Sequence, residues 1–162
     1  MGKLRLATYN VEWFNALFDD RGRMLADAEL SARYKVTRAE QLGALGIVFT
    51  ALDADGVMII EAPDQNGQRS TVLALENFAR HFGLRVRKAI IGFTSDTEQE
   101  IAFLYDPDRM RLHHDPQGTP APSHGAPGVP RFDSQLRVDV DGDGIADLVR
   151  FSKPPLELAV TV

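Results

Sequence analysis

Four apolar residues in a row, Val57 to Ile60, lie between the turn segment Asp53 to Gly56 and the carboxylate of Glu61. A continuous apolar run of this length, bounded by turn residues, is typical of a strand that is buried on both faces of its sheet. Pro63 lacks a backbone N–H, which excludes further pairing in the middle of a sheet. The run therefore predicts a central strand that stops at Glu61.

The segments before this strand predict one more strand and one helix. Residues 4–10 alternate apolar side chains with others, which predicts a strand ending in Asn10. Residues 38–52 carry leucine and phenylalanine at helical spacing, so they predict a helix with one buried face. Thr37 and Glu40 have the spacing of a capping box, which places the helix start at Arg38.

The segments after the central strand predict a second helix and then short strands. Ser70 can cap a helix that stops at Gly83, and the order strand, helix, strand, helix predicts a sheet covered by helices. Between the later segments, residues 115–130 are rich in proline and glycine and predict an irregular loop. Three short strand-like segments predict neighbouring antiparallel strands or hairpins; they are Leu84 to Gly92, Glu100 to Tyr105 and Met110 to His114. Further strands are predicted over Leu136 to Val140 and Ile145 to Phe151, on either side of an acidic turn, and over Leu156 to Val162.

Length and composition predict one domain, residues 1–162, of the α/β (α+β) class. A chain of 162 residues can bury about 70% of its unfolded surface in a single core. The absence of cysteine excludes disulfides and thiolate metal sites, and no signal peptide or membrane-spanning run is recognisable, so we expect a cytoplasmic protein. A net charge of −5 without a basic cluster argues against unaided binding of long nucleic-acid duplexes.

Glu61 and Asn10 are the first candidates for chemistry. Glu61 follows a buried strand, and open sheets with helices place their ligand sites at the carboxyl ends of strands. A carboxylate there needs a cation, which can be an arginine or helix N-terminus in a structural role, or Mg²⁺ in a functional one. Asn10 is set among large apolar residues. Its amide can close the strand end by forming a hydrogen bond with its own backbone, or it can find its hydrogen-bond partners in a pocket.

Three sequence motifs, taken in order, resemble the endonuclease/exonuclease/phosphatase superfamily of metal-dependent phosphoesterases. They are T-Y-N-V-E-W-F at 8–14, V-M-I-I-E-A at 57–62 and I-A-F-L-Y-D-P at 101–107, and the resemblance extends to F-S-K-P-P-L-E-L-A-V at 151–160. The resemblance implies that Asn10 orients the phosphate or a metal-bound water and that Glu61 ligates Mg²⁺ or Mn²⁺. It also implies a mixed sheet with helices on one face, as in one half of a four-layer α/β/β/α sandwich.

The chain departs from that superfamily in two ways. Members more often have glutamine where this chain has Ile60. Members are also longer, and their second half supplies an Asp-x-Asn motif and a terminal Asp-His pair that have no candidates here. We therefore expect an N-terminal part of a longer catalytic domain that holds only part of the active site for a phosphodiester or phosphomonoester, nucleic acid included. Alone, it should be inactive and should self-associate through an uncovered sheet face. The alternative is a non-catalytic calcium-binding or interaction domain that keeps the fold.

An acidic segment near the end of the chain is the third candidate. Carboxylates at Asp139, Asp141, Asp143 and Asp147, with Gly144 at the sixth position, match the spacing of oxygen ligands in Ca²⁺ loops. Arg150 replaces the glutamate that a full EF-hand loop requires. The other interpretation is an acidic Asp-Gly turn between two strands. The pattern predicts a structural Ca²⁺ site with no catalytic role.

Overall fold

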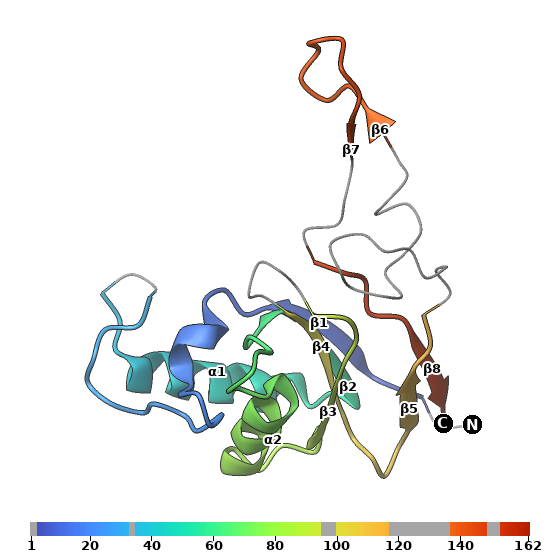
Figure 1. The fold of residues 1–162 in the computed structure, drawn as a ribbon. Helices are drawn as coiled ribbons and strands as arrows, with labels where there is room; N and C mark the ends of the chain where they lie inside the picture. Colours follow the sequence, from blue (N-terminus) through green and yellow to red (C-terminus); the bar gives the residue numbers. More distant parts are fainter. Residues whose placement is uncertain (1–2, 33–34, 95–99, 117–136, 149–152) are drawn as a thin grey trace.

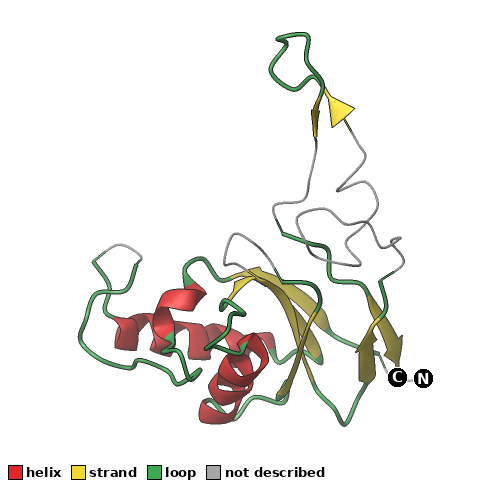
Figure 2. Cartoon of the chain, in the orientation of Figure 1, coloured by secondary structure: helices red, strands yellow, loops and turns green. Residues whose placement is uncertain are grey.

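The computed structural model describes residues 3–32, 35–94, 100–116, 137–148 and 153–162. The described residues form an α/β fold with two α-helices, a four-stranded mixed sheet and two small antiparallel pairs of strands (Figures 1 and 2). In chain order the elements are β1 (Leu6–Asn10), η1 (Phe14–Leu17), α1 (Arg38–Leu52), β2 (Gly56–Ala62), α2 (Thr71–His81), β3 (Lys88–Ile91), β4 (Glu100–Tyr105), β5 (Arg111–His114), β6 (Arg137–Val138), β7 (Asp147–Leu148) and β8 (Leu158–Thr161).

The main sheet has the strand order β1-β2-β4-β3, so the predicted central strand is indeed internal. β1 and β2 are parallel and are connected through α1, whereas β4 runs antiparallel to both β2 and β3. In the parallel pair Asn10 lies opposite Ile60, and the Val11 N–H donates to the Ile60 carbonyl at 3.0 Å. The carboxyl ends of β1 and β2 therefore meet at one edge of the sheet.

Both helices cover the same face of this sheet, as predicted, and the core lies between the two layers. Alternation along the strands directs Val57 and Ile59 of β2 to this face, and both are buried. An aromatic cluster joins the helices, because the ring of Phe78 on α2 lies 5.2 Å from that of Phe49 on α1 and 5.3 Å from that of Phe14. These edge-to-face contacts tie η1, α1 and α2 into one packed unit.

The ends of α1 follow the local sequence. The Thr37 side chain accepts from the Glu40 N–H at 3.2 Å, and Glu40 Oε2 accepts from the Thr37 N–H at 2.9 Å, so the predicted capping box is present. The helix ends where Asp53 adopts a left-handed conformation, with φ of 40°. Because the cap and the stop are both local signals, the sequence predicted the bounds of this helix correctly.

The opposite face of the sheet is apolar but is only partly uncovered. Phe103 of β4 is buried there, and its ring comes so close to Gly56 that a side chain at position 56 would collide with it. Met58 and Ile60 are half-buried, whereas Leu6 at the edge strand is 61% exposed. The β5–β8 pair lies beyond the sheet on the side away from the helices (Figure 1). Self-association through this face stays a prediction.

Two sequence predictions for the later segments need adjustment. The β5 strand pairs with β8 and not with its sequence neighbour β4. The sequence could not predict this pairing, because turn residues show where a strand ends but do not specify a partner that is distant in the chain. The strand predicted over Leu84 to Gly92 is limited to β3. Most of the Pro/Gly-rich loop 115–130, namely residues 117–130, lies outside the described residues, as do Leu136 and residues 149–152.

Candidate functional site

The end of β2 contains a bulge at Glu61. The pairing of β2 with β4 shifts register between Ile60 and Ala62, and Glu61 between them has a left-handed backbone with φ of 61°. In a regular strand, Glu61 would be directed to the helix-covered face that Ile59 lines. The bulge removes it from this alternation, so that Ala62 fills the core instead. A left-handed conformation is strained for a residue other than glycine, and such strain is often found at functional sites.

Asn10 closes the end of the adjacent strand. Its Oδ1 atom accepts a hydrogen bond from the Glu12 N–H at 3.2 Å, which is the backbone-bonding role that one interpretation of the sequence predicted. The turn continues into Trp13, whose φ of 62° is also left-handed. The Asn10 side chain therefore fixes the turn, and it does so while lying at the same sheet edge as Glu61.

Asn10 and Glu61 line one cleft of about 710 Å³ between the carboxyl ends of β1 and β2 and the first turns of α1. The structure thus brings Asn10 and Glu61 to the same cleft, although these two candidates are far apart in the sequence. The lining residues combine acidic, amide, aromatic and aliphatic side chains; they are Tyr9, Asn10, Val11, Glu12, Trp13, Val36, Glu40, Gln41, Ala44, Leu45, Val48 and Glu61.

The charges around this cleft are acidic. Glu12, Glu40 and Glu61 line it, and none of its lining residues within the described part of the chain is basic. Hydrogen bonds from the Thr37 backbone N–H and hydroxyl lower the pKa of Glu40 below its ordinary value, so its carboxylate is ionised at neutral pH. Carboxylate and amide oxygens are the ligands that Mg²⁺ prefers, and Asn10, Glu12, Glu40 and Glu61 offer such oxygens in the lining. Among the described residues, however, the group of three acidic side chains whose oxygens lie within 4.8 Å of one another is Asp139, Asp141 and Asp147, outside this cleft.

A buried arginine, Arg69, joins η1 to the segment that follows β2. Arg69, which precedes α2, donates to the carbonyls of Phe18 at 3.1 Å and Asp19 at 3.0 Å, and also to Asn15 Oδ1. The same Asn15 oxygen accepts from the Asp64 N–H at 3.1 Å, just after β2. This network fixes η1, which follows the turn at Trp13, against the segment that follows β2.

The cleft adds ten lining residues that sequence reasoning did not predict as site residues, among them Glu12, Trp13, Glu40 and Gln41. Glu12 and Trp13 had a local signal, since both directly follow Asn10. Glu40 and Gln41 had none, because only the packing of α1 against β1 brings them to the site, where Gln41 Nε2 donates to the Glu12 carbonyl at 3.5 Å. Buried Gln41 Oε1 has no hydrogen-bond partner among the described residues.

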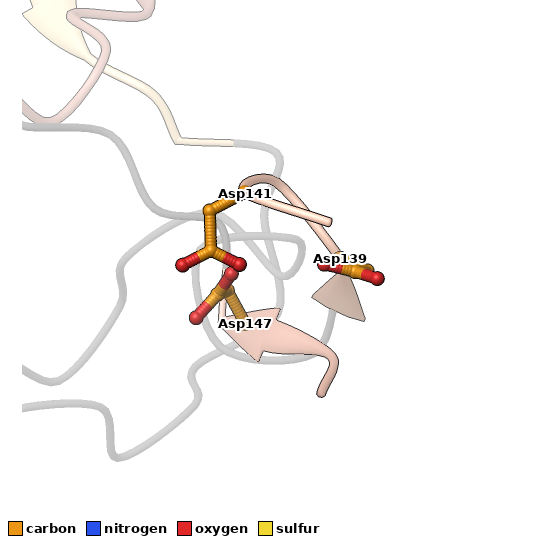
Figure 3. A group of neighbouring side chains, drawn as sticks. All are labelled: Asp139, Asp141 and Asp147. Carbon is orange, nitrogen blue, oxygen red and sulfur yellow. The ribbon is translucent and has the colours of Figure 1, made fainter. Parts of the chain in front are cut away.

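The acidic segment forms the loop of the β6–β7 hairpin. Oxygen atoms of Asp139, Asp141 and Asp147 lie within 4.8 Å of one another, and all three residues are exposed. Figure 3 shows the carboxylates of Asp141 and Asp147 directed toward each other. Asp143 is not part of this group, and its Oδ1 instead accepts from the Ile145 N–H at 2.7 Å. Three of the four predicted ligands are therefore close together, and exposed acidic groups of this kind also occur without an ion.

Comparisons with known proteins do not assign the chain to a family. No model of a known protein family matches the chain, and neither the curated proteins nor the solved structures contain a significant match. Within the described part of the chain, neither helix is long and apolar enough to cross a membrane. The resemblance to the endonuclease/exonuclease/phosphatase superfamily stays a prediction.

Proposed function

We propose that this chain contributes the Asn10–Glu61 edge of a metal-dependent phosphoesterase site. The observation that supports the proposal is that both residues lie at the carboxyl ends of adjacent parallel strands and line the same cleft. In the proposal Glu61 binds Mg²⁺ or Mn²⁺, and the Asn10 amide orients the phosphate or a metal-bound water. The metal is essential because an acidic cleft would otherwise repel a phosphoester anion.

In this proposal the site is incomplete. A phosphoester hydrolase needs groups that align the attacking water and stabilise the leaving group, since positioning and charge stabilisation supply most of the rate in phosphoryl transfer. The described residues of the cleft include acidic and amide groups but no lysine, arginine or histidine for these roles. We therefore propose that the rest of the site comes from another part of the parent protein, and that residues 1–162 alone turn over substrate very slowly.

Metal binding by the chain is the direct test. Isothermal titration with Mg²⁺ and Mn²⁺ should detect one site that Glu61→Gln abolishes and that Asp108→Asn, which removes an acidic group at the opposite end of the sheet, leaves intact. Asn10→Asp is informative because it keeps the acceptor for the Glu12 N–H while losing the amide donor. Full metal affinity in the Glu61→Gln protein would remove Glu61 from the site and refute this proposal.

Activity is tested beside binding. The wild-type chain and the parent protein, once its full sequence is expressed, are assayed on bis(4-nitrophenyl) phosphate and 4-nitrophenyl phosphate with Mg²⁺. We expect turnover by the parent that Glu61→Gln reduces by several orders of magnitude. Robust turnover by the 162-residue chain would show that the catalytic residues lie elsewhere.

A second candidate, a calcium-binding domain without catalytic activity, is favoured by one observation. Asp139, Asp141 and Asp147 offer three carboxylate oxygens at one point of the β6–β7 hairpin. In this proposal the ion serves structure, because three carboxylates this close repel one another unless a cation lies between them. Chelation should then loosen the hairpin and leave the α/β core unchanged.

A further inference from the structure

We propose that Thr71 and Asn15 are positioning residues for Glu61, because their hydrogen bonds hold the segment that keeps Glu61 in a strained backbone conformation. This segment, residues 62–64, is called the anchored segment. The proposal rests on Glu61 as the metal ligand of the proposed function, and it adds the groups that place the Glu61 carboxylate. Its conformational part is measured by protein stability and needs no metal.

The backbone of Glu61 is unusual for a residue inside a strand. In the described part of the chain, three residues other than glycine have positive φ, namely Trp13, Asp53 and Glu61. Asp53 ends α1 and Trp13 precedes η1, whereas Glu61 lies within β2, where the pairing shifts register between Ile60 and Ala62. A left-handed bulge residue is usually glycine, since a Cβ atom strains this conformation. The conformation of Glu61 therefore has to be imposed by the surrounding structure.

The sheet fixes the chain immediately before Glu61. Ile60 pairs with Asn10 on one side and with Ile101 on the other, and its carbonyl accepts from the Val11 N–H at 3.0 Å. Pairing on both sides restricts rotation of the backbone at Ile60. A change of the backbone at Glu61 would therefore have to be taken up by the residues that follow it.

The anchored segment is held by two side chains from other elements. Pro63 is buried, and its carbonyl accepts at 2.7 Å from Oγ1 of Thr71, the first residue of α2. The N–H of Asp64 donates at 3.1 Å to Oδ1 of Asn15, which lies in η1. Ala62 and Thr71 are fully buried, so loss of the Thr71 hydroxyl would leave the Pro63 carbonyl without its partner in the core.

Arg69 in turn fixes the side chain of Asn15. Its guanidinium donates to the same Oδ1 atom and also to the Phe18 carbonyl at 3.1 Å, and Arg69 is only 9% exposed. The Asn15 amide cannot rotate away without losing the hydrogen bonds from both Arg69 and Asp64. The anchored segment is therefore fixed relative to both η1 and α2.

The position of the Glu61 carboxylate follows from these restraints. Because the chain is held on both sides, the Glu61 side chain lines the cleft with Asn10, and Ala62 takes its place in the core. A carboxylate that is already in place loses less conformational entropy when it binds an ion. Thr71 and Asn15 lie outside the cleft lining, so they act on the proposed site through Glu61.

The strain is measured by comparing glycine with alanine at position 61, since both substitutions remove the carboxylate. Urea denaturation should give an equilibrium constant for folding that is about fivefold larger for Glu61→Gly than for Glu61→Ala, because only glycine adopts this conformation without strain. In an unstrained strand glycine is the less stable of the two, so the sign of the difference is informative. Equal stability, or a more stable alanine variant, would overturn the proposal.

The comparison is then repeated with one anchor removed. Thr71→Val has nearly the same shape but no hydroxyl, so the anchored segment can relax and the advantage of glycine should disappear. Thr71→Ser keeps the hydroxyl and should keep the advantage. Asp55→Asn should also keep it, and this variant controls for a general loss of stability because Asp55 lies at the opposite edge of the sheet. An advantage of glycine that Thr71→Val leaves unchanged would reject the role of Thr71.

Asn15 is examined in the same way and provides a second route if the Thr71→Val protein does not fold. Asn15→Ala removes the acceptor and should reduce the advantage of glycine at position 61. Asn15→Asp keeps an acceptor for both Arg69 and Asp64 and should preserve it. The same advantage in both Asn15 variants would show that Asn15 does not hold the anchored segment.

Metal affinity separates this proposal from the proposed function. Isothermal titration with Mn²⁺ should show about tenfold weaker binding by Thr71→Val than by Thr71→Ser. Equal affinity of these two variants, in a chain whose binding Glu61→Gln abolishes, would contradict the positioning role. A wild-type chain that binds no Mn²⁺ would refute the metal site, and the comparison of glycine with alanine would still decide whether Thr71 and Asn15 hold Glu61.

Discussion

Arg85 Nη1 donates a 3.0 Å hydrogen bond to Oδ1 of Asp55, a carboxylate that is only 5% exposed. The other oxygen of Asp55 accepts from the backbone N–H of Arg5 at 2.8 Å. Asp55 lies just before β2, at the sheet edge opposite the cleft, and therefore ties β1, β2 and the segment before β3 together. The Arg5 hydrogen bond and then that of Arg85 lower the pKa of Asp55 below the ordinary 3.8.

The first prediction is that this pair makes the fold acid-labile. Since the pKa of Asp55 is lowered on folding, its contribution to stability is complete above the ordinary value of 3.8 and is lost as the pH falls below it. Asp55→Asn should cost about 1–3 kcal/mol at neutral pH and flatten the loss of stability below about pH 4. Urea denaturation at a series of pH values measures both effects. The exposed Asp143→Asn is the control and should keep the wild-type pH dependence.

The second prediction concerns Phe78, whose ring lies at the centre of the aromatic cluster. Replacing it by alanine leaves a cavity between α1, α2 and η1, because the surrounding rings cannot all move inward, and should cost about 3–5 kcal/mol. Phe78→Leu should cost less, because it keeps most of the volume. Thermal and chemical denaturation compare the two variants. A loss below about 1 kcal/mol for Phe78→Ala would show that the helices do not share the core described above.

The third prediction concerns the start of α1. Thr37→Ala removes a side chain that accepts from the Glu40 N–H and should cost about 0.5–2 kcal/mol, whereas Thr37→Ser should be close to neutral. The start of α1 also positions Glu40 and Gln41 at the cleft. Hydrogen exchange of the first turn of α1 should therefore increase in Thr37→Ala but not in Thr37→Ser. Unchanged exchange would show that packing, and not the cap, holds this end.

The fourth prediction concerns the β6–β7 hairpin and Ca²⁺. If three carboxylates hold an ion there, Asp141→Asn should abolish Ca²⁺ binding, whereas Asp143→Asn should reduce it much less, because Asp143 lies outside the group. Nuclear magnetic resonance titration with Ca²⁺ and then with chelator follows the hairpin amides directly. Identical hairpin spectra with Ca²⁺ and with chelator would leave only the interpretation of a hydrogen-bonded Asp-Gly turn.

The sequence by itself determined the elements whose signals are local. The capping box of Thr37 and Glu40 marked where α1 begins, and the run Val57 to Ile60 marked the internal strand, because capping and burial on both faces leave patterns within a few residues. It also indicated Asn10 and Glu61, since both stand where strands end and open sheets place ligand sites, although Asn10 has a structural role as well, as the acceptor of the Glu12 N–H. The acidic spacing of residues 139–147 indicated a loop, which the structure closes as a hairpin.

Only the tertiary structure decided which of these residues meet. Packing of α1 against β1 brought Glu40 and Gln41 to Asn10, and the bulge at Glu61 turned that side chain out of the core alternation. The tertiary structure also separated Asp143 from Asp139, Asp141 and Asp147, and it paired β5 with β8, which are distant in the chain. Such contacts depend on long-range packing, whose free energy is shared among many residues, so no short segment of the sequence specifies them.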